Sequence, residues 1–312
     1  MPAPALARSR LVRVLVTILL LALVAWKVDV SAVLSHLVGI EPGALGVATA
    51  LGFLAYLGRA WRWRLLLHRA GVGVSLAAAY RLTLVGVFYG VFTPGRAGEV
   101  AKVAHLRTSV SRALPSVFWE RITDGVLLEI LALPWFLTRG TVGPLSFTYM
   151  VMVLATVGVV AAGSSPGIPR WVVGRWPHLA GGVGDWSRGS GGILVSRALL
   201  LGLAGGVAFF AVNFTGAFGL AVAVSPGVGP GILLLFPVII LLGNLPVAFG
   251  GLGLREAVAA SAFAREGLDP AAGPALSLAW FACVTLIPGV LGFVVQQLAA
   301  RPARDRRDEG AA

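Results

Sequence analysis

The sequence GILVSRALLLGLAGGVAFFAVNFTGAFGLAVAV, residues 192–224, contains one charged residue, Arg197. A helix that crosses the hydrocarbon core of a bilayer needs about 20 consecutive, mostly apolar residues. This stretch exceeds that length, and Gly202 and Gly206 within it have the spacing that lets membrane helices approach closely. It therefore predicts a transmembrane helix, although glycine is so frequent in this chain that the spacing alone is weak evidence.

Seven further apolar stretches flank this one, at 11–28, 43–67, 76–93, 125–138, 145–163, 231–249 and 273–299. In the whole chain 57% of residues are hydrophobic and 12% are charged, whereas soluble globular chains carry about 25% charged residues. We therefore expect an all-α integral membrane protein and not a soluble enzyme. A single polytopic membrane domain is expected over residues 1–299, and a disordered cytoplasmic tail over 300–312.

The distribution of basic residues predicts the topology, because positively charged short loops stay in the cytoplasm. If all eight stretches cross, the basic residues divide almost evenly between the two sides. If 76–121 dips in from the cytoplasm and 231–268 from the outer face, the outer side keeps only Lys27, Arg139, Arg255 and Arg265. We therefore predict about six full spans plus two re-entrant hairpins, with both termini cytoplasmic; eight simple spans are the alternative.

The first apolar run follows or includes Arg8, Arg10 and Arg13, as in a signal peptide or a first membrane anchor. We favour the anchor, because no A-x-A cleavage site follows the run and every later segment is hydrophobic too. The expected location is a bacterial inner membrane.

Two turns rich in Gly, each with a Pro, interrupt the apolar stretches of the predicted hairpins, and each places a Glu where a new helix would begin. Interrupted segments at corresponding places in two halves of opposite topology predict an inverted repeat with a binding site at the breaks. Non-helical backbone at membrane depth must be buried in protein or line a water-filled cavity; ordinary surface loops are the alternative. The candidate residues at the turns are Pro94, Gly98, Glu99, Pro246, Gly250, Gly251, Gly253, Arg255 and Glu256.

Charged residues near the first turn are further candidates. The segment Arg59–Arg64 interleaves Arg with Trp, which suits the level of lipid headgroups; Arg62 is the candidate here, with plain anchoring as the alternative. Residues 94–121 have helical amphipathic spacing, which predicts a helix at the membrane surface or against a wet cavity. On such a helix Glu99 and Lys102 share a face and could form an ion pair.

The next charged group, Glu120-Arg121-x-x-Asp124, is expected to open the fourth apolar stretch. On a helix Glu120 and Asp124 share a face, and Arg121 points away from both. A structural network that joins these residues to the first turn is as plausible as direct substrate contact. Arg255 and Glu256 are adjacent, so they should diverge and have other partners.

Several function classes lack their sequence signals. The net charge of +12 comes mostly from Arg between apolar runs, which is typical of membrane-flanking loops and not of a nucleic-acid surface. Cys283 is the single cysteine and the four His are scattered, so neither a disulfide framework nor a metal site is expected. No P-loop, G-x-S-x-G elbow or His-Glu metal motif occurs, and no cofactor or catalytic residue is assigned.

In their order along the chain, these residues resemble the flippase-like transmembrane region of lysylphosphatidylglycerol synthases. The resemblance covers nearly the whole chain, and although each motif is weak, their succession is fairly specific. It implies a membrane module, alone or fused to a cytosolic aminoacyl transferase, that moves lipid between leaflets; nothing after Ala299 is expected to form the transferase. The resemblance rests on Arg62 with Leu65-Leu66, Pro94 with Gly98-Glu99 and Lys102, Glu120-Arg121-x-x-Asp124, and Pro246 with Gly250-Gly251-Leu252-Gly253 and Arg255-Glu256.

The resulting hypothesis is a lipid transporter in which the hairpins enclose a polar cavity. Arg62, Lys102 and Arg255 would neutralise a phosphate-bearing or otherwise anionic headgroup, and Glu99 and Glu256 would hold these cations or pair with a cationic headgroup. A lipid-modifying enzyme that uses a carboxylate as acid or base is one alternative. A membrane partner of a separate lipid synthase is another, and a second copy of this chain remains open as a partner.

Overall fold

The computed structural model describes residues 28–93, 96–106, 108–139, 143–165, 173–175, 180–194, 197–245 and 251–300, and residues 19, 22, 26 and 171. The regular structure of these residues is entirely helical. Four helices are long and apolar enough to cross a bilayer: Pro42–Arg69, Leu145–Ser164, Arg197–Val224 and Ala272–Ala299. The predicted all-α membrane fold is thus confirmed. The first apolar run lies mostly outside the described residues, and residues 301–312 lie entirely outside them.

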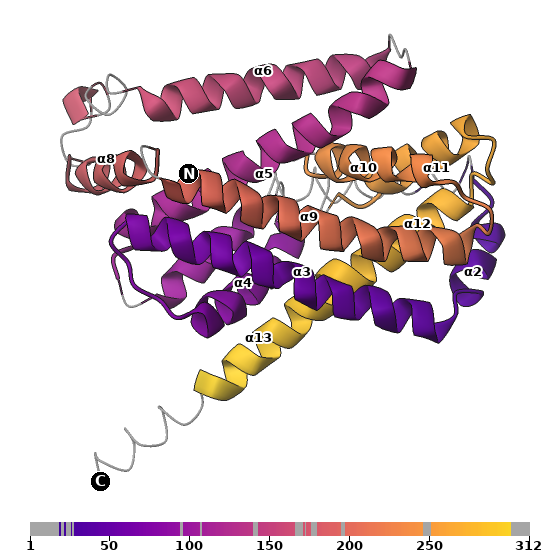
Figure 1. Ribbon diagram of the computed structural model, residues 1–312, viewed down its shortest axis with the longest axis horizontal. Coiled ribbons are helices and arrows are strands. Elements are labelled where there is room, and N and C mark those ends of the chain that lie inside the picture. Colours follow the sequence, from indigo (N-terminus) through magenta and orange to yellow (C-terminus); the bar gives the residue numbers. More distant parts are fainter. Residues whose placement is uncertain are drawn as a thin grey trace.

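Helices α3 (Pro42–Arg69) and α9 (Arg197–Val224) lie side by side along the molecule (Figure 1). They touch backbone to backbone at a glycine pair: a Cβ added to Gly58 would lie 2.9 Å from the carbonyl oxygen of Gly205, and a Cβ on Gly205 would lie 2.9 Å from that of Gly58. Such small-residue contacts replace the hydrophobic effect as the source of helix association in lipid. The short α2 (Val30–Val38) precedes α3 and is capped by the Asp29 carboxylate.

Helix α5 (Val110–Arg139) crosses beside these two, and α8 (Ala180–Leu194) packs at its first turns. Helix α6 (Pro144–Ser164) forms the edge of the molecule (Figure 1). Its most apolar stretch of 18 residues contains no buried residue. A surface this apolar suits lipid rather than water. The sequence predicted that Glu120, Arg121 and Asp124 open an apolar helix; α5 begins earlier, so they lie in its middle.

Two apolar helices are too short to cross: α4 (Leu76–Val91) and α10 (Leu235–Gly243), which follows the 3₁₀ turn η3 (Pro230–Leu234). At 1.5 Å per residue they are about 24 Å and about 14 Å long, against a hydrocarbon core of about 30 Å. After each one the chain breaks, and a second element packs against it: the 3₁₀ helix η1 (Ala97–His105) on α4, and α11 (Leu254–Arg265) on α10.

The structure changes one prediction about this region. Residues 94–121 were expected to form one amphipathic helix at the membrane surface or against a wet cavity, but the described residues divide into η1, a non-helical link and the start of α5. Glu99, Lys102 and Val103 on η1 are buried, because η1 lies on α4 and α5 rather than at the surface.

The last rod consists of α12 (Ala272–Phe281), the π-helical turn η4 (Ala282–Leu286) and α13 (Ile287–Ala300). Pro288 explains the π turn: it has no N–H to donate to the carbonyl of Val284, four residues back. The chain widens instead, and the N–H of Ile287 donates to the carbonyl of Ala282, five residues back.

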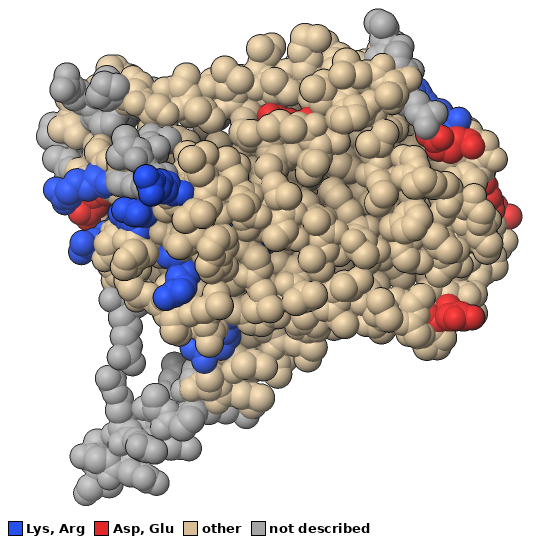
Figure 2. Space-filling model, in the orientation of Figure 1, with Lys and Arg blue, Asp and Glu red and all other residues tan. Residues whose placement is uncertain are grey.

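The two ends of the face in Figure 2 differ in charge. Most of its Lys and Arg atoms lie at the end near α8, and most of its Asp and Glu atoms lie at the opposite end near α2, although each end also has some atoms of the other sign. At the acidic end, the loop before α12 contacts α2 through Asp269, which lies 2.7 Å from His36. The surface between the two ends is largely uncharged (Figure 2).

Candidate functional site

The centre of the site is a pair of arginines on one face of α3. Arg59 and Arg62 are three residues apart and both are buried, so their guanidinium groups project in the same direction. Arg64 belongs to the same sequence motif but is exposed and donates to the carbonyl of Val74. The Arg-Trp segment therefore divides into a buried ionic face and an exposed side.

Three buried carboxylates surround these arginines. Arg59 Nη2 donates to Glu99 Oε2 and to Asp124 Oδ2, both at 3.0 Å, and Arg59 Nε donates to Glu120 Oε1 at 3.2 Å. Arg62 Nη2 lies 2.5 Å from Asp124 Oδ1 and 3.8 Å from Glu120 Oε1. Arg59 thus joins η1 to two positions of α5, and removing it would leave three charges with fewer partners.

Two more cations join this ion-pair network. Lys102 is fully buried, donates to Glu120, and has its ammonium 4.2 Å from the centre of the Trp63 ring. Arg121 Nη2 lies 2.7 Å from Glu99 Oε2 and 3.1 Å from Asp124 Oδ2. We call Arg59, Arg62, Lys102, Arg121, Glu99, Glu120 and Asp124 the ion-pair network; it has one more cation than carboxylates.

Two glycine pairs make room for this network, Gly86 with Gly90 on α4 and Gly202 with Gly206 on α9. On α4, a Cβ on Gly90 would lie 2.8 Å from Glu99 Cγ, and one on Gly86 would lie 3.1 Å from Lys102 Cδ. On α9, a Cβ on Gly206 would lie 2.6 Å from Arg62 Nη1. The spacing that lets helices approach each other here lets long charged side chains lie against a helix.

The first break is a tight turn. Thr93 Oγ1 accepts the N–H of Gly98 at 2.6 Å, and a Cβ on Gly98 would lie 2.3 Å from the carbonyl oxygen of Tyr89, so glycine is required there. Arg96 has a left-handed backbone, with φ of 57°, which is a strained conformation for a residue with a side chain. The strain aims Arg96 inward: its Nη2 donates to Thr285 at 3.4 Å, and its Nε lies 3.8 Å from Glu99.

The second break holds Arg255 beside the same space. Glu256 is buried, accepts the N–H of Gly253 at 2.6 Å and the hydroxyl of Ser277 at 2.8 Å, and so fixes the start of α11. The Arg255 guanidinium lies 4.3 Å from the centre of the Phe281 ring and 3.6 Å from Glu256. Its Nε and Nη2 have no hydrogen-bond partner among the described residues.

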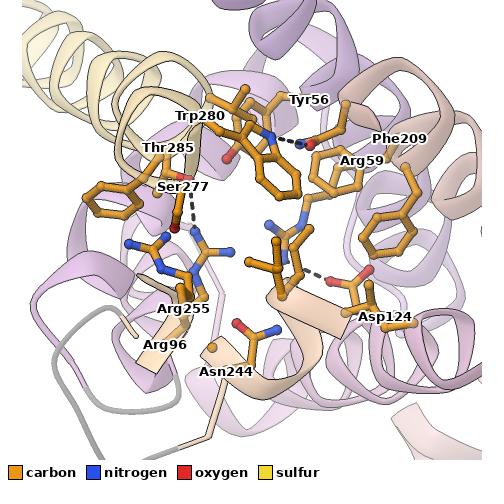
Figure 3. A pocket seen from close by; sticks show the side chains of 18 of the residues that line it. Tyr56, Arg59, Arg96, Asp124, Phe209, Asn244, Arg255, Ser277, Trp280 and Thr285 are labelled. Carbon is orange, nitrogen blue, oxygen red and sulfur yellow. Dashed lines mark hydrogen bonds and ion pairs between the residues drawn. The ribbon is translucent and has the colours of Figure 1, made fainter. Parts of the chain in front are cut away.

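A cavity lies beside the two breaks and is lined by side chains of both (Figure 3). Its other lining residues come from about the middle of α3, α5, α9 and the α12–α13 rod. It contains about 720 Å³ of empty space, counting the part continuous with the exterior. The guanidinium groups of Arg96 and Arg255 face that of Arg59 across it (Figure 3). Its charged lining residues are four cations and one carboxylate: Arg59, Arg96, Arg121, Arg255 and Asp124.

The remaining walls of the cavity are aromatic and polar. The indole N–H of Trp280 donates to Asn213 at 2.9 Å, and both residues line the space together with Tyr56, Phe209 and Ser277. No group of His, Cys, Asp and Glu suited to a metal ion occurs among the described residues. The arrangement can therefore bind an anionic group by its arginines and an apolar group by its rings.

The predicted site residues fall into three sets. The ion-pair network contains six of them: Arg62, Glu99, Lys102, Glu120, Arg121 and Asp124. Five lie at the breaks: Gly98, Gly251, Gly253, Arg255 and Glu256. Three lie outside the described residues: Pro94, Pro246 and Gly250. Arg62 and Lys102 do not line the cavity.

Two predicted pairings are wrong. Lys102 pairs with Glu120 and not with Glu99, because Glu99 is turned toward Arg59 and Arg121. Arg121 does not point away from its neighbours: three residues separate it from Asp124 on α5, close enough for contact. Arg255 and Glu256 do not diverge as predicted, since Arg255 Nη2 lies 3.6 Å from Glu256 Oε1, although Glu256 does have other partners.

Sequence reasoning missed Arg59, Arg96, Asn213 and Trp280 as site residues. Arg59 could have been found from its three-residue spacing to Arg62. Asn213 could have been found as an amide inside an apolar run, since polar groups in spanning helices usually have a function. The sequence contains no comparable signal for Trp280, whose role depends on the position of α12 against α9.

Fold and site together define a multi-pass α-helical membrane protein with a buried ionic network beside an arginine-lined cavity. A comparison with known protein families matches residues 10–292 to the family of the lysylphosphatidylglycerol synthase transmembrane region. The chain belongs to this family, as the sequence motifs indicated, and its class is a membrane protein related to lipid metabolism. No curated protein is similar enough to count as a match.

Proposed function

We propose that this chain moves a lipid with an anionic, phosphate-bearing headgroup between the leaflets of a bacterial inner membrane. The observation that carries the proposal is the charge of the cavity lining, in which four arginines oppose a single carboxylate. Burying a phosphate in a low-dielectric medium is prohibitive unless cations and hydrogen-bond donors surround it. Guanidinium groups supply both.

The depth of the cavity supports the same function. Arg59, Asp124 and Asn213 lie near the middle of the helices that carry them. We propose that α4 with η1 and α10 with α11 are re-entrant hairpins from opposite faces, and that six other segments span. The basic end in Figure 2 would face the cytoplasm together with both termini. A headgroup could then pass the midplane beside the arginines while its chains stay in lipid.

A leaflet-exposure assay in reconstituted vesicles tests the proposal. Fluorescent phosphatidylglycerol in phosphatidylcholine vesicles reports movement by the fraction that an impermeant quencher can reach. We expect Arg255→Gln to slow movement at least tenfold, since Arg255 lines the cavity and has unpaired N–H groups. Arg265→Gln is the matched control, because Arg265 is on the same helix but exposed.

Equal rates for wild type and Arg255→Gln would contradict the proposed site. Mass spectrometry of lipid recovered from the vesicles separates transport from the alternative of a lipid-modifying enzyme, because transport leaves the lipid unchanged. Each carboxylate of the network is paired with at least two cations.

A further inference from the structure

A buried carboxylate outside the ion-pair network has no assigned role. Glu129 on α5 has 7% of its surface exposed. Its Oε1 accepts the hydroxyl of Thr156 on α6 at 2.6 Å, and its backbone carbonyl accepts the hydroxyl of Tyr149 at 2.8 Å. Among the described residues it forms no ion pair, unlike Glu99, Glu120 and Asp124.

Among the described residues, no cation on the elements packed around Glu129 forms an ion pair with it. Helices α6 and α10 and the turn η3 contain no Asp, Glu, Lys, Arg or His, and Tyr149 is the only titratable residue among them. On α9 the only charged residue is Arg197, at its first position. The charged residues of α8, Asp185 and Arg188, pair with each other near the first turn of α5. Five charged residues of α3 and α5 belong to the ion-pair network: Arg59, Arg62, Glu120, Arg121 and Asp124. The other basic residues lie in the last two turns of α3, which contain Arg64, His68 and Arg69, and at the two ends of α5, which contain Arg112 and Arg139.

Glu129 lies close to the cavity along α5. It follows Asp124 by five residues, or about 7.5 Å along the helix axis. Arg121, Gly125 and Glu129 are spaced by four residues and so share one face. A Cβ on Gly125 would have only Thr156 Oγ1 within 4 Å, at 4.0 Å. The face between the carboxyl group and the cavity arginine is therefore open.

We propose that Glu129 is a proton-binding site that couples lipid movement to proton movement, an inference that rests on the proposed function. A carboxylate without a cation in hydrocarbon surroundings is costly, so it takes up a proton. The proton comes from the aqueous phase on one side, binds a carboxyl oxygen to give the neutral acid, and leaves to the phase on the other side. No other bond forms or breaks.

The anionic headgroup supplies the coupling. A phosphate among the cavity arginines would lie about one to two helix turns from Glu129 and would raise the free energy of its carboxylate form. Lipid binding therefore favours proton binding, and by linkage proton binding favours lipid binding to the same extent. Headgroup and proton together carry less charge across the membrane than the headgroup alone.

Vesicle transport under an imposed pH gradient tests the coupling. With fluorescent phosphatidylglycerol as the probe, we expect the wild-type rate to change at least threefold when the gradient is imposed. Glu129→Gln should move lipid at a rate that no longer depends on the gradient. Glu41→Gln, which changes an exposed acid at the start of α3, should keep the wild-type dependence.

A second measurement reports proton binding directly. Infrared difference spectra of the reconstituted protein between high and low pH should contain a protonated-carboxyl band that Glu129→Gln lacks and Glu41→Gln retains. Wild-type movement that ignores the gradient, or an identical band in Glu129→Gln, would overturn the coupling and leave lipid transport intact. Absence of lipid movement under every condition would overturn the proposed function, and the coupling with it.

Discussion

The excess of cations in the ion-pair network predicts an asymmetry between two substitutions of one ion pair. Lys102 and Glu120 are both fully buried and contact each other. Lys102→Met leaves three cations and three carboxylates, whereas Glu120→Gln leaves four cations and two carboxylates. Removing one partner of a buried pair costs about 3–5 kcal/mol. We expect Glu120→Gln to reach that range and Lys102→Met to cost distinctly less.

The magnitude follows from the contacts that each substitution removes. Glu120 accepts from Arg59 and Lys102 and lies 3.8 Å from Arg62, so its loss affects three cations. Lys102 loses one carboxylate and the Trp63 ring, and Met retains much of its stem volume. A unit-charge pair at 4 Å is worth about 4 kcal/mol at an effective dielectric constant of 20 before desolvation is counted.

Thermal unfolding in detergent micelles, followed by tryptophan fluorescence, measures the difference. At about 2.1 cal/mol/K of unfolding entropy per residue, one kcal/mol corresponds to about 1.5 °C in the unfolding midpoint of a chain of 312 residues. Glu120→Gln should therefore lower the midpoint by roughly 5–8 °C. The double substitution should cost less than the sum of the two single losses, because the interaction between Lys102 and Glu120 can be lost only once. A larger loss for Lys102→Met than for Glu120→Gln would refute the assigned charge imbalance.

Three further predictions follow from other contacts. Gly206→Ala should destabilise the protein by about 1–3 kcal/mol, because the new methyl would lie 2.5 Å from a leucine side chain of α5; Gly219→Ala on the same helix, with nothing within 4 Å, should be neutral or stabilising in the same unfolding assay. Asn213→Ala should cost about 1–3 kcal/mol by leaving the buried indole N–H of Trp280 without its acceptor, and Trp280→Phe in the same chain should recover part of the loss in midpoint. Hydrogen bonds from His36 on α2 and from the N–H of Ala271 hold the pKa of Asp269 below its ordinary value of 3.8. The ionised carboxylate therefore stabilises the folded state fully above pH 3.8, and this stabilisation is lost as the pH falls through the lower pKa of the folded state. Asp269→Asn should flatten the dependence of the unfolding midpoint on pH below about 4, and an unchanged slope would contradict the assignment.

Much of the fold could be predicted from composition and run length. The long apolar runs correspond to α3, α6, α9 and the α12–α13 rod, because a bilayer demands a minimum length of apolar helix. The middle of α5 was harder to predict as helix, because the charged residues Glu120, Arg121 and Asp124 interrupt its apolar sequence as the end of a membrane helix would. Only the neighbouring arginines of α3 make these charges tolerable inside a helix, and that contact is not local in sequence.

Only part of the pairing within the ion-pair network could be predicted from the sequence. Helical spacing correctly brought Glu120 and Asp124 to one face, where both contact Arg59. It failed for Glu99 and Lys102 because η1 packs against other helices that offer closer partners: Glu99 pairs with Arg59 on α3 and Arg121 on α5, and Lys102 pairs with Glu120 on α5. The arginines of the cavity come from four different elements, and no spacing within one element predicts that they converge.

The π turn in the last rod has a mechanical consequence. Pro288 removes one rung of the hydrogen-bond ladder between α12 and α13, at the level where Thr285 receives the Arg96 donor. A helix bends most easily where backbone hydrogen bonds are missing. The α12–α13 rod is therefore easiest to bend beside the cavity arginines, and a rotation of α13 about this point would change the width of the cavity without unfolding either helix.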